Sequence, residues 1–345
     1  MTDGNHTMSL FTKATKVTRR AALGLLSAAT LLPVLGADAA HATDLKQITV
    51  DWAYYNPVSL ILKDQKLLEQ EFADDGIRIR WVQSHGSNKA IEFLNSRSAD
   101  FASTAGSAAL LAKINGSPIN AIYVYSKPEW TALVTNKDSD IQTVEDLRGK
   151  SVAVTRGTDP YIFLLRALAN HGLSESDIKP VLLQHADGGN ALKRGQVDAW
   201  AGLDPMMAGQ ELKDGVRLFF RDADLNTYGF LNTRTAFAEE HPEIVNRVLA
   251  VYEQGRKFAQ ENPDVLRDTL AKAARLEPEV AERQLERTDL TNPFIGDVHH
   301  EHITGAGLAL QSAGIIAEDV DVEANVTALI DRQFVAPFVA EQASN

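Results

Sequence analysis

The sequence predicts an α/β protein of two lobes, joined by two crossings of the chain and completed by a helical C-terminal tail. Three observations support this prediction. Segments typical of strands alternate with segments typical of helices in two successive series, which implies mostly parallel sheets covered by helices. No low-complexity linker separates the two series. From residue 236 onward the pattern is helical, and the tail is expected to return to the first lobe.

The first series builds the first lobe. Its strands are expected at 47–54, 77–83, 101–104 and 119–125, and its helices at 57–72, 88–95 and 107–114. The segment 57–72 has the apolar spacing of an amphipathic helix, with one side formed by Leu60, Ile61, Leu67, Leu68 and Phe72.

The second series builds the second lobe. Its strands are expected at 131–135, 152–155, 181–184, 197–201 and 218–221, and its helices at 144–150, 160–169, 191–194 and 205–212. One more strand is expected at 228–232, after the second crossing. The crossings fall at 126–130 and 222–227, and the tail helices at 242–259, 263–274, 277–288, 303–312 and 322–338. Lobe 1 is therefore assigned to residues 43–128 and 229–345, and lobe 2 to residues 129–228.

Residues 1–42 have the three regions of an export signal. An apolar run at 21–35 is followed by Ala-x-Ala sites at 37–39 and 40–42, and it is preceded by Lys13, Lys16, Arg19 and Arg20. The segment 18–23 resembles a twin-arginine signal, with a general secretory signal as the alternative. Cleavage is expected after Ala42, with Ala39 as the second choice. The apolar run is short for a membrane span, although an uncleaved anchor stays an alternative.

Composition and charge exclude several classes of function. The 345 residues contain no cysteine, which rules out disulfides, thiolate catalysis and cysteine-ligated zinc. A formal net charge of -12 disfavours nucleic acid as a partner. The chain also lacks the Gly-x-Ser-x-Gly motif of a hydrolase nucleophile.

Small and helix-capping residues gather where each expected strand meets the next helix. In 152–166 an apolar strand ends at Gly157, and a helix opens at Thr158 or Asp159 with Pro160 in its first turn. Similar junctions lie at 52–57, 84–89, 103–107, 184–188 and 201–205. A helix N-terminus presents unpaired N–H groups and partial positive charge, which favours an anion. We expect the junctions to converge on one anionic ligand, with ordinary capping as the alternative for any single one.

At these junctions the sequence resembles the periplasmic substrate-binding proteins of aliphatic sulfonate transporters, within the broader nitrate/sulfonate/taurine group. The resemblance extends from about Asp51 to the C-terminal helix. It rests on Tyr54-Tyr55-Asn56-Pro57, Gly86-Ser87-Asn88-Lys89-Ala90, Ser103-Thr104-Ala105-Gly106-Ser107 and residues 125–130, 157–161, 183–188 and 198–205. It implies a Venus-flytrap (periplasmic-binding-protein) fold with a hinge, a periplasmic location, a monomer, a small sulfonate ligand, and an ABC permease with its ATP-binding subunit as partners. No cofactor or metal is expected.

The candidate ligand-binding residues come from the junctions. A sulfonate stays ionised and offers only acceptor oxygens, so its receptor needs donors, which Ser87, Asn88, Thr104, Ser107 and Thr158 supply. Aromatic rings would cover an alkyl or aryl tail. The complete set is Tyr54, Tyr55, Asn56, Gly86, Ser87, Asn88, Thr104, Ala105, Gly106, Ser107, Trp130, Gly157, Thr158, Asp159, Tyr161, His185 and Asp204.

Several charged or basic residues allow two interpretations. Asp159 is interpreted first as a helix cap, because a carboxylate repels an anion. Asp204 is a cap or a partner for an amino or hydroxyl group of the ligand, and Arg156 is a counter-ion or part of a salt bridge. The segment His299-His300-Glu301-His302 is interpreted as a solvated helix start, because no fourth metal ligand is evident.

The predicted function is the capture of an aliphatic sulfonate and its delivery to an ABC importer for sulfur acquisition. The alternatives are a binding protein for taurine, nitrate or another small anion, a desulfinase-like enzyme on the same fold, and a receptor that serves chemosensing. The desulfinases of this group use a nucleophilic cysteine, which the chain lacks.

Overall fold

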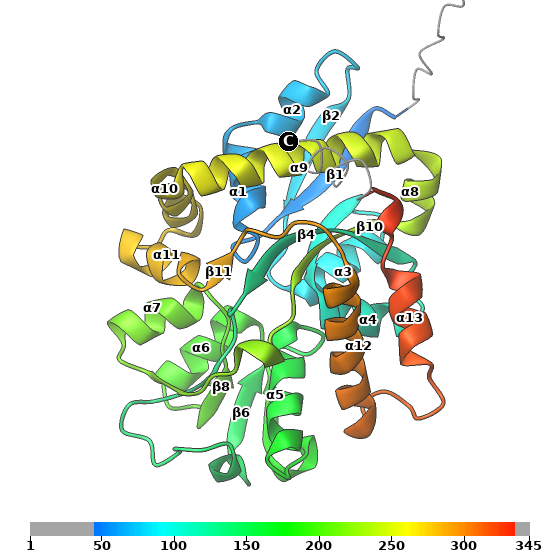
Figure 1. The fold of residues 1–345 in the computed structure, drawn as a ribbon. Helices are drawn as coiled ribbons and strands as arrows, with labels where there is room; N and C mark the ends of the chain where they lie inside the picture. Colours follow the sequence, from blue (N-terminus) through cyan, green and yellow to red (C-terminus); the bar gives the residue numbers. More distant parts are fainter. Residues whose placement is uncertain (1–44, 335–345) are drawn as a thin grey trace, which may run out of the picture. The chain divides into compact units, whose positions relative to one another are not determined.

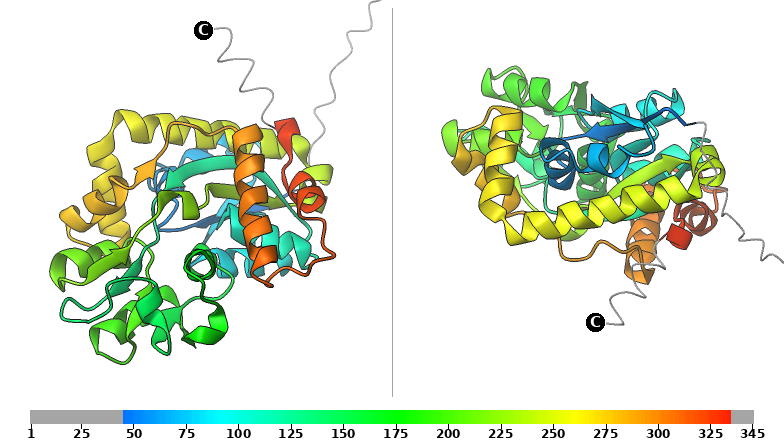
Figure 2. Two further views of the ribbon diagram at one scale, coloured as in Figure 1. Left: turned by 60° about the horizontal axis from the view of Figure 1, so that its bottom comes forward. Right: turned by 90° about the horizontal axis from the view of Figure 1, so that it is seen from above.

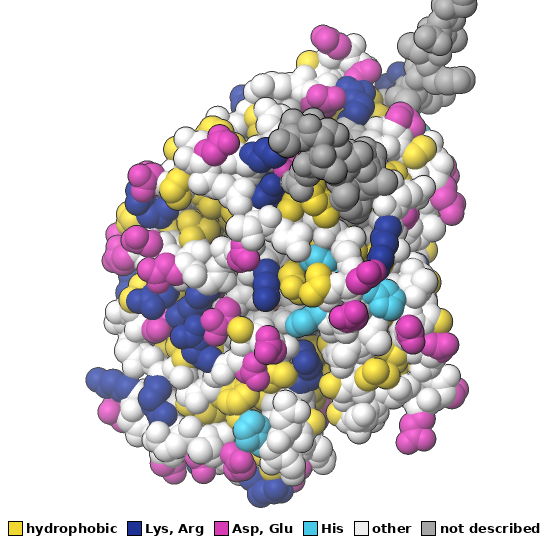
Figure 3. Space-filling view, in the orientation of Figure 1, with side chains coloured by type: hydrophobic (Ala, Val, Ile, Leu, Met, Phe, Trp, Pro, Cys, Tyr) yellow, Lys and Arg dark blue, Asp and Glu magenta, His cyan; other side chains and the backbone are white. Residues whose placement is uncertain are grey.

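The computed structural model describes residues 45–334, so the predicted export signal at 1–42 lies outside the described residues. Figure 1 shows these residues as strands flanked by helices, with the C-terminal helices beside the N-terminal strands. None of the helices within 45–334 is long and apolar enough to cross a bilayer. On the face shown in Figure 3, acidic and basic side chains are interspersed.

One sheet has six strands in the order β11-β4-β10-β3-β1-β2. Their bounds are β1 (Gln47–Trp52), β2 (Arg78–Gln83), β3 (Phe101–Ala105), β4 (Ile119–Pro128), β10 (Gly229–Arg234) and β11 (Thr288–Asp289). Strand β1 pairs in parallel with β2 and β3, whereas β10 runs antiparallel to both β3 and β4.

The other sheet has five strands in the order β7-β6-β8-β5-β9. They are β5 (Leu133–Thr135), β6 (Ser151–Val154), β7 (Lys179–Leu182), β8 (Ala199–Ala201) and β9 (Arg217–Phe220). Strand β6 is parallel to β7 and β8, and β5 is antiparallel to β8 and β9. The prediction of mostly parallel sheets is therefore wrong. The strand that follows each crossing, β5 or β10, inserts antiparallel between two strands that share one direction.

The helices between the strands follow the predicted order with three changes. They are α1 (Pro57–Asp64), α2 (Leu67–Glu71), α3 (Ser87–Asn95), α4 (Gly106–Ile114), α5 (Asp159–Asn170), α6 (His185–Lys193) and α7 (Met206–Lys213). The single helix predicted at 57–72 is broken, because Lys66 is left-handed with a φ of 53°. The segment predicted at 144–150 forms only a 3₁₀ turn at Glu145–Leu147.

Helix α6 begins at His185, well before the predicted start at residue 191. Two glycines near its N-terminus lowered the helical signal, since glycine is a poor helix former. The structure gives the reason for glycine there. A Cβ on Gly188 would lie 2.9 Å from Nε1 of Trp200, so α6 can approach Trp200 on β8 only if this position carries no side chain.

The C-terminal segment returns to the first sheet. It comprises α8 (Thr235–Glu240), α9 (Pro242–Glu261), α10 (Pro263–Ala274), α11 (Pro278–Leu285), α12 (Asp297–Ser312) and α13 (Val322–Leu329). Helix α9, yellow in Figures 1 and 2, packs on α1 and α2, and α12 and α13 pack on α4. Helix α8 falls in the region expected to be helical from residue 236, although no separate helix was assigned there, and α12 begins earlier than the predicted 303. The predicted helices at 277–288 and 322–338 end early, at Leu285 and Leu329, and residues 335–338 lie outside the described residues.

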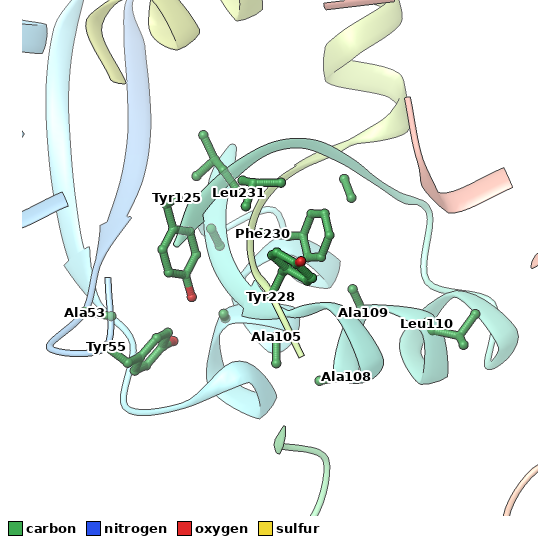
Figure 4. Packing of buried hydrophobic residues seen from close by; sticks show 14 of the residues in the cluster. Ala53, Tyr55, Ala105, Ala108, Ala109, Leu110, Tyr125, Tyr228, Phe230 and Leu231 are labelled. Atoms are coloured by element: carbon green, nitrogen blue, oxygen red, sulfur yellow. The ribbon is translucent and has the colours of Figure 1, made fainter. Parts of the chain in front are cut away.

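Buried aromatic rings fix the start of α4 against the first sheet. Figure 4 shows Tyr228 and Phe230 beside Ala105 and Ala109, whose small side chains leave room for the rings. A Cβ on Gly106 would lie 2.7 Å from the Phe230 ring, so this helix start also needs glycine. The core thereby places the N-terminus of α4 at the end of β3.

Candidate functional site

Three helices begin around one small cavity, which we call the head chamber. Its lining residues are Tyr55, Gly86, Ser87, Trp130, Thr158, Asp159, Pro160, His185 and Leu203. The N-cap positions are Gly86 for α3, Thr158 for α5 and Gln184 for α6. The first backbone N–H groups of each helix have no partner within that helix. The free volume is about 10 Å³, close to the space of one water molecule.

A larger cavity of about 260 Å³, which we call the tail cavity, adjoins the head chamber. The two share Tyr55, His185 and Leu203. The remaining lining residues of the tail cavity are Tyr54, Ser84, His85, Lys89, Gln184, Ala186, Asp204, Pro205 and Met206. The site therefore combines a tight chamber at helix N-termini with a wider space of mixed aromatic, apolar and polar character.

Segments that follow strands of both sheets meet at the head chamber, and glycine permits the approach. Gly86 follows β2 of the first sheet, and a Cβ there would lie 2.9 Å from Nε2 of His185, which follows β7 of the second. Gly157 has a φ of 76°, and a Cβ there would lie 3.6 Å from Cβ of Asn88. The predicted residues Gly86, Asn88, Gly157 and His185 are thus brought together.

The hydrogen bonds determine which hydroxyl protons remain for a ligand. Ser107 donates its proton to Asp159 at 2.6 Å, and Thr158 donates to the carbonyl oxygen of Thr155 at 2.6 Å. Ser87 differs, because its Oγ accepts from the backbone N–H of Ala105 at 3.0 Å. Its own proton has no acceptor among the described residues. Of these three predicted hydroxyl donors, Ser87 is the one that keeps a proton to donate.

Asp159 was interpreted as a helix cap, and this interpretation is wrong. Its Oδ1 accepts from Ser107 at 2.6 Å and from the Thr227 hydroxyl at 2.7 Å. Its Oδ2 accepts from Trp130 Nε1 at 2.7 Å and from the Thr227 backbone N–H at 3.0 Å. The carboxylate joins the start of α5 to the start of α4 and to both predicted chain crossings. Four donors compensate its charge at the wall of the head chamber.

His185 is buried, with an exposed fraction of 1%. Its Nδ1 lies 3.2 Å from Oγ1 of Thr155. Its Nε2 is buried without a hydrogen-bond partner among the described residues. Burial lowers the pKa of His185 to about 3, so the imidazole is neutral at physiological pH.

A buried carboxylate that sequence reasoning missed lies under the aromatic wall of the site. Asp51 accepts from the Ser84 hydroxyl at 2.5 Å, and from the backbone N–H of Ser103 at 2.9 Å and its hydroxyl at 2.8 Å. The Tyr55 hydroxyl lies 2.9 Å from Ser84 Oγ. Burial raises the pKa of Asp51 to about 6 despite these donors. A lone acid within the apolar strand 47–52 was the available signal.

Asp204 both caps the start of α7 and forms an ion pair. It accepts from the backbone N–H of Ala208 at 2.8 Å, which agrees with the capping interpretation. Its second partner is Arg287, at 3.2 Å, which also pairs with Glu211. Both Arg287 and Asp204 are buried. Burial raises the pKa of Asp204 to about 6, against the opposing effect of Arg287.

Arg156 forms the salt bridge that was one of its two interpretations. Its guanidinium lies 2.8 Å from Glu175, and its side chain is 57% exposed. The hydroxyl of Tyr161 donates to the same Glu175 at 2.9 Å, and Arg156 stacks over the Tyr161 ring. These contacts direct both side chains toward Glu175.

The other predicted site residues have structural contacts. Asn56 caps α1 by accepting from Ser59 N at 3.2 Å, and the Thr104 hydroxyl accepts from Asn232 at 2.8 Å. Ala105 and Gly106 form the buried start of α4. Whether these residues or Tyr161 contact a ligand stays a prediction.

The histidine segment 299–302 lies in the first turns of α12. His299 is fully buried against Tyr228, so the interpretation of a solvated helix start is wrong for this residue. Its Nδ1 accepts from Gly296 N at 3.0 Å, whereas His300 lies against Thr327. Within residues 45–334 no three His, Cys, Asp or Glu side chains are placed to hold a metal ion.

Comparison with known proteins establishes the family. Residues 72–265, more than half of the chain, match the family described as NMT1/THI5 like. The chain belongs to this family. A Bacillus subtilis protein named for binding aliphatic sulfonates is 27% identical over 312 residues, which cover 90% of this chain and 92% of that protein. An Escherichia coli protein with the same name is 33% identical over 197 residues, covering 56% and 61% of the two chains.

A solved structure shows the same fold. The alkanesulfonate-binding protein SsuA of Xanthomonas axonopodis pv. citri, bound to MOPS, matches with a TM-score of 0.73 and 26% identity. The match covers 85% of this chain and 97% of that one. The predicted fold class and the predicted relationship to sulfonate-binding proteins are therefore confirmed.

Proposed function

We propose that the protein captures an aliphatic sulfonate outside the cytoplasm and passes it, as a monomer in the periplasm, to an ABC permease with its ATP-binding subunit. The sulfonate would then serve as a sulfur source. One observation carries the proposal: three helix N-termini converge on a small chamber that adjoins a wider cavity with aromatic and apolar walls. The donors of the chamber suit an anionic head and the wider cavity suits an uncharged tail, and the chamber, which has space for about one water molecule, must widen to admit the head.

The head chamber has the donors that a sulfonate requires. Backbone N–H groups at the starts of α3 and α6, the N–H of Asp159 at the start of α5, where Pro160 has none, and the free proton of Ser87 can donate to acceptor oxygens. No lysine or arginine is among the described residues that line it. A monoanion suits such a wall, because helix N-termini carry only partial charges and Asp159 already contributes a full negative charge.

The tail cavity supports a sulfonate over an inorganic anion. Nitrate or sulfate would occupy the head chamber and leave about 260 Å³ beside it unfilled. Tyr54, Leu203, Pro205 and Met206 offer apolar surface there. Burying apolar tail against this surface contributes about 25 cal/mol per Å².

The proposed lobes are residues 43–128 with 229–345, and residues 129–228. The two sheets are built from residues within these two groups. We expect the lobes to open about segments 126–130 and 222–227 and to close over the ligand. The absence of cysteine from the chain supports binding rather than desulfinase chemistry.

Calorimetric titration tests the proposal. The purified protein is titrated with methanesulfonate, butane-1-sulfonate, taurine, nitrate and sulfate in Tris, because many common biological buffers are themselves sulfonates. Tight binding of butane-1-sulfonate, recovered intact by mass spectrometry, supports the proposal. Ala186→Leu, at the exposed start of α6, should reduce affinity for butane-1-sulfonate and spare methanesulfonate. Binding of nitrate alone, or release of sulfite, would contradict the proposal.

A further inference from the structure

The unpartnered nitrogen of His185 is a buried polar atom at the head chamber. The side chain is 1% exposed and lines both the head chamber and the tail cavity. Its Nε2 has no hydrogen-bond partner within residues 45–334. A Cβ on Gly86 would lie 2.9 Å from this nitrogen and 2.9 Å from Oδ1 of Asn88, so glycine leaves the nitrogen uncovered on that side. A buried polar atom without a protein partner points to a ligand contact.

The hydrogen bonds of Thr155 fix the tautomer of His185. The Thr155 hydroxyl donates its one proton to the carbonyl oxygen of Leu183 at 2.7 Å. Toward Nδ1 of His185, at 3.2 Å, the same oxygen can only accept. The neutral imidazole therefore carries its proton on Nδ1, and Nε2 presents a lone pair to the head chamber.

A lone pair is the wrong partner for a sulfonate. Such an anion has no proton to donate, so a neutral Nε2 would repel its oxygens. The charged and titratable groups that face His185 across the two cavities are Tyr54, Tyr55, His85, Lys89, Asp159 and Asp204. On its own helix, Asp187 is exposed.

None of these groups can donate a hydrogen bond to the ligand in place of a protonated Nε2. Lys89 is already paired with Glu92 at 2.6 Å and borders only the tail cavity, and Asp159 is an acceptor for four donors. Protonation would turn Nε2 into a charged donor directed at the ligand, while Nδ1–H keeps its bond to Thr155.

We propose that His185 binds the anion as an imidazolium, so that each sulfonate is taken up together with one proton. This inference rests on the proposed function. The free imidazole is neutral because burial disfavours its charge, and the negative ligand compensates that charge in the complex. Binding and protonation therefore stabilise each other. Affinity should fall as pH rises, by up to tenfold per pH unit.

The test is calorimetric titration with butane-1-sulfonate between pH 5 and pH 8. Titrations are repeated in imidazole and in Tris, which have different ionisation enthalpies, so that the buffer dependence of the heat counts protons. We expect uptake of about one proton at the acidic end and weaker affinity at the alkaline end. The sulfonate stays ionised throughout, so a pH-dependent affinity reports on the protein.

Two variants test whether the proton that is taken up binds to His185. His185→Gln should lose the uptake of about one proton and, with it, the tenfold fall in affinity per pH unit. His300→Gln, the same change on α12, should behave as the wild type. Binding without proton uptake in the wild type overturns the inference and leaves the proposed function intact. Uptake that persists in His185→Gln also overturns it, and no binding of any sulfonate overturns the proposed function and the inference together.

Discussion

Replacing Asp159 with alanine should destabilise the protein strongly. The carboxylate is 2% exposed and accepts four hydrogen bonds. Two of the donors, Trp130 Nε1 and the Thr227 backbone N–H, have no second acceptor among the described residues. The other two are the hydroxyls of Ser107 and Thr227, which rotate and can find other partners.

The indole N–H of Trp130 and the backbone N–H of Thr227 cannot rotate to another acceptor, so they determine how much stability is lost. A buried donor left without an acceptor costs about 1–3 kcal/mol, so Asp159→Ala should lower the free energy of unfolding by about 4 kcal/mol. Asp159→Asn keeps an oxygen toward the indole and the backbone N–H, and its amide can donate to the hydroxyls. It loses only the charge assistance of the two retained bonds, about 2 kcal/mol in total.

Urea unfolding, followed by tryptophan fluorescence and circular dichroism, measures both variants. Asp187→Ala is the control, because this exposed acid in the first turn of α6 contributes less than about 1 kcal/mol through the helix N-terminus. If Asp159→Ala costs no more than the control, Asp159 does not hold the four donors together. Equal costs for the alanine and asparagine variants would refute the assignment of the loss to orphaned donors.

Three further predictions concern other parts of the site. Ser87→Ala should weaken binding of butane-1-sulfonate about 10- to 150-fold, because a hydrogen bond to a charged group contributes about 1.5–3 kcal/mol. Thr158→Ser, which keeps the hydroxyl, should bind normally, and equal affinity of both variants by calorimetry removes Ser87 from the site. From pH 4 to pH 7, unfolding of the wild type should become easier relative to Asp51→Asn by about 2.4 kcal/mol, because the folded protein raises the pKa of Asp51 from 3.8 to about 6. A pH-independent difference in urea titrations contradicts this prediction. Arg287→Met should cost about 3–5 kcal/mol by leaving a buried carboxylate unpaired, against less than about 1 kcal/mol for the half-exposed Arg283→Gln, and equal urea midpoints would contradict it.

The order of helices and strands was predictable because its signals are local. Apolar segments and caps lie within a few residues of the element that they define. Strand direction was not predictable in the same way. The antiparallel insertion of β5 and β10 depends on where the chain re-enters each sheet, which the local pattern of apolar residues does not report. The start of α6 was missed because its glycines are required by the close contact with Trp200, which lies on β8 and is distant in the sequence.

The lining of the site was largely predictable for the same reason. Residues at the ends of parallel strands gather at one edge of each sheet, and segments from both sheets meet at the head chamber, so the sequence predicted most of its lining. Leu203 was missed, since an apolar residue beside Asp204 gives no signal of its own. Asp51 was missed because its partners, Ser84 and Ser103, lie 33 and 52 positions away in the sequence.

The chemistry of the site depends on which group receives each proton, and that is a property of distant contacts. Ser107 looks like a ligand donor in sequence, but its proton goes to a carboxylate 52 positions later. That carboxylate, Asp159, looks like a cap or a repulsive charge, but it is the acceptor of four hydrogen bonds within the wall. Once these protons are assigned, Ser87 and the N-terminal backbone N–H groups are left to face an anion, beside the bare Nε2 of His185. Among the residues that line the chamber, His185 has an unpartnered nitrogen that becomes a donor when it takes up a proton, which is why we place the proton there.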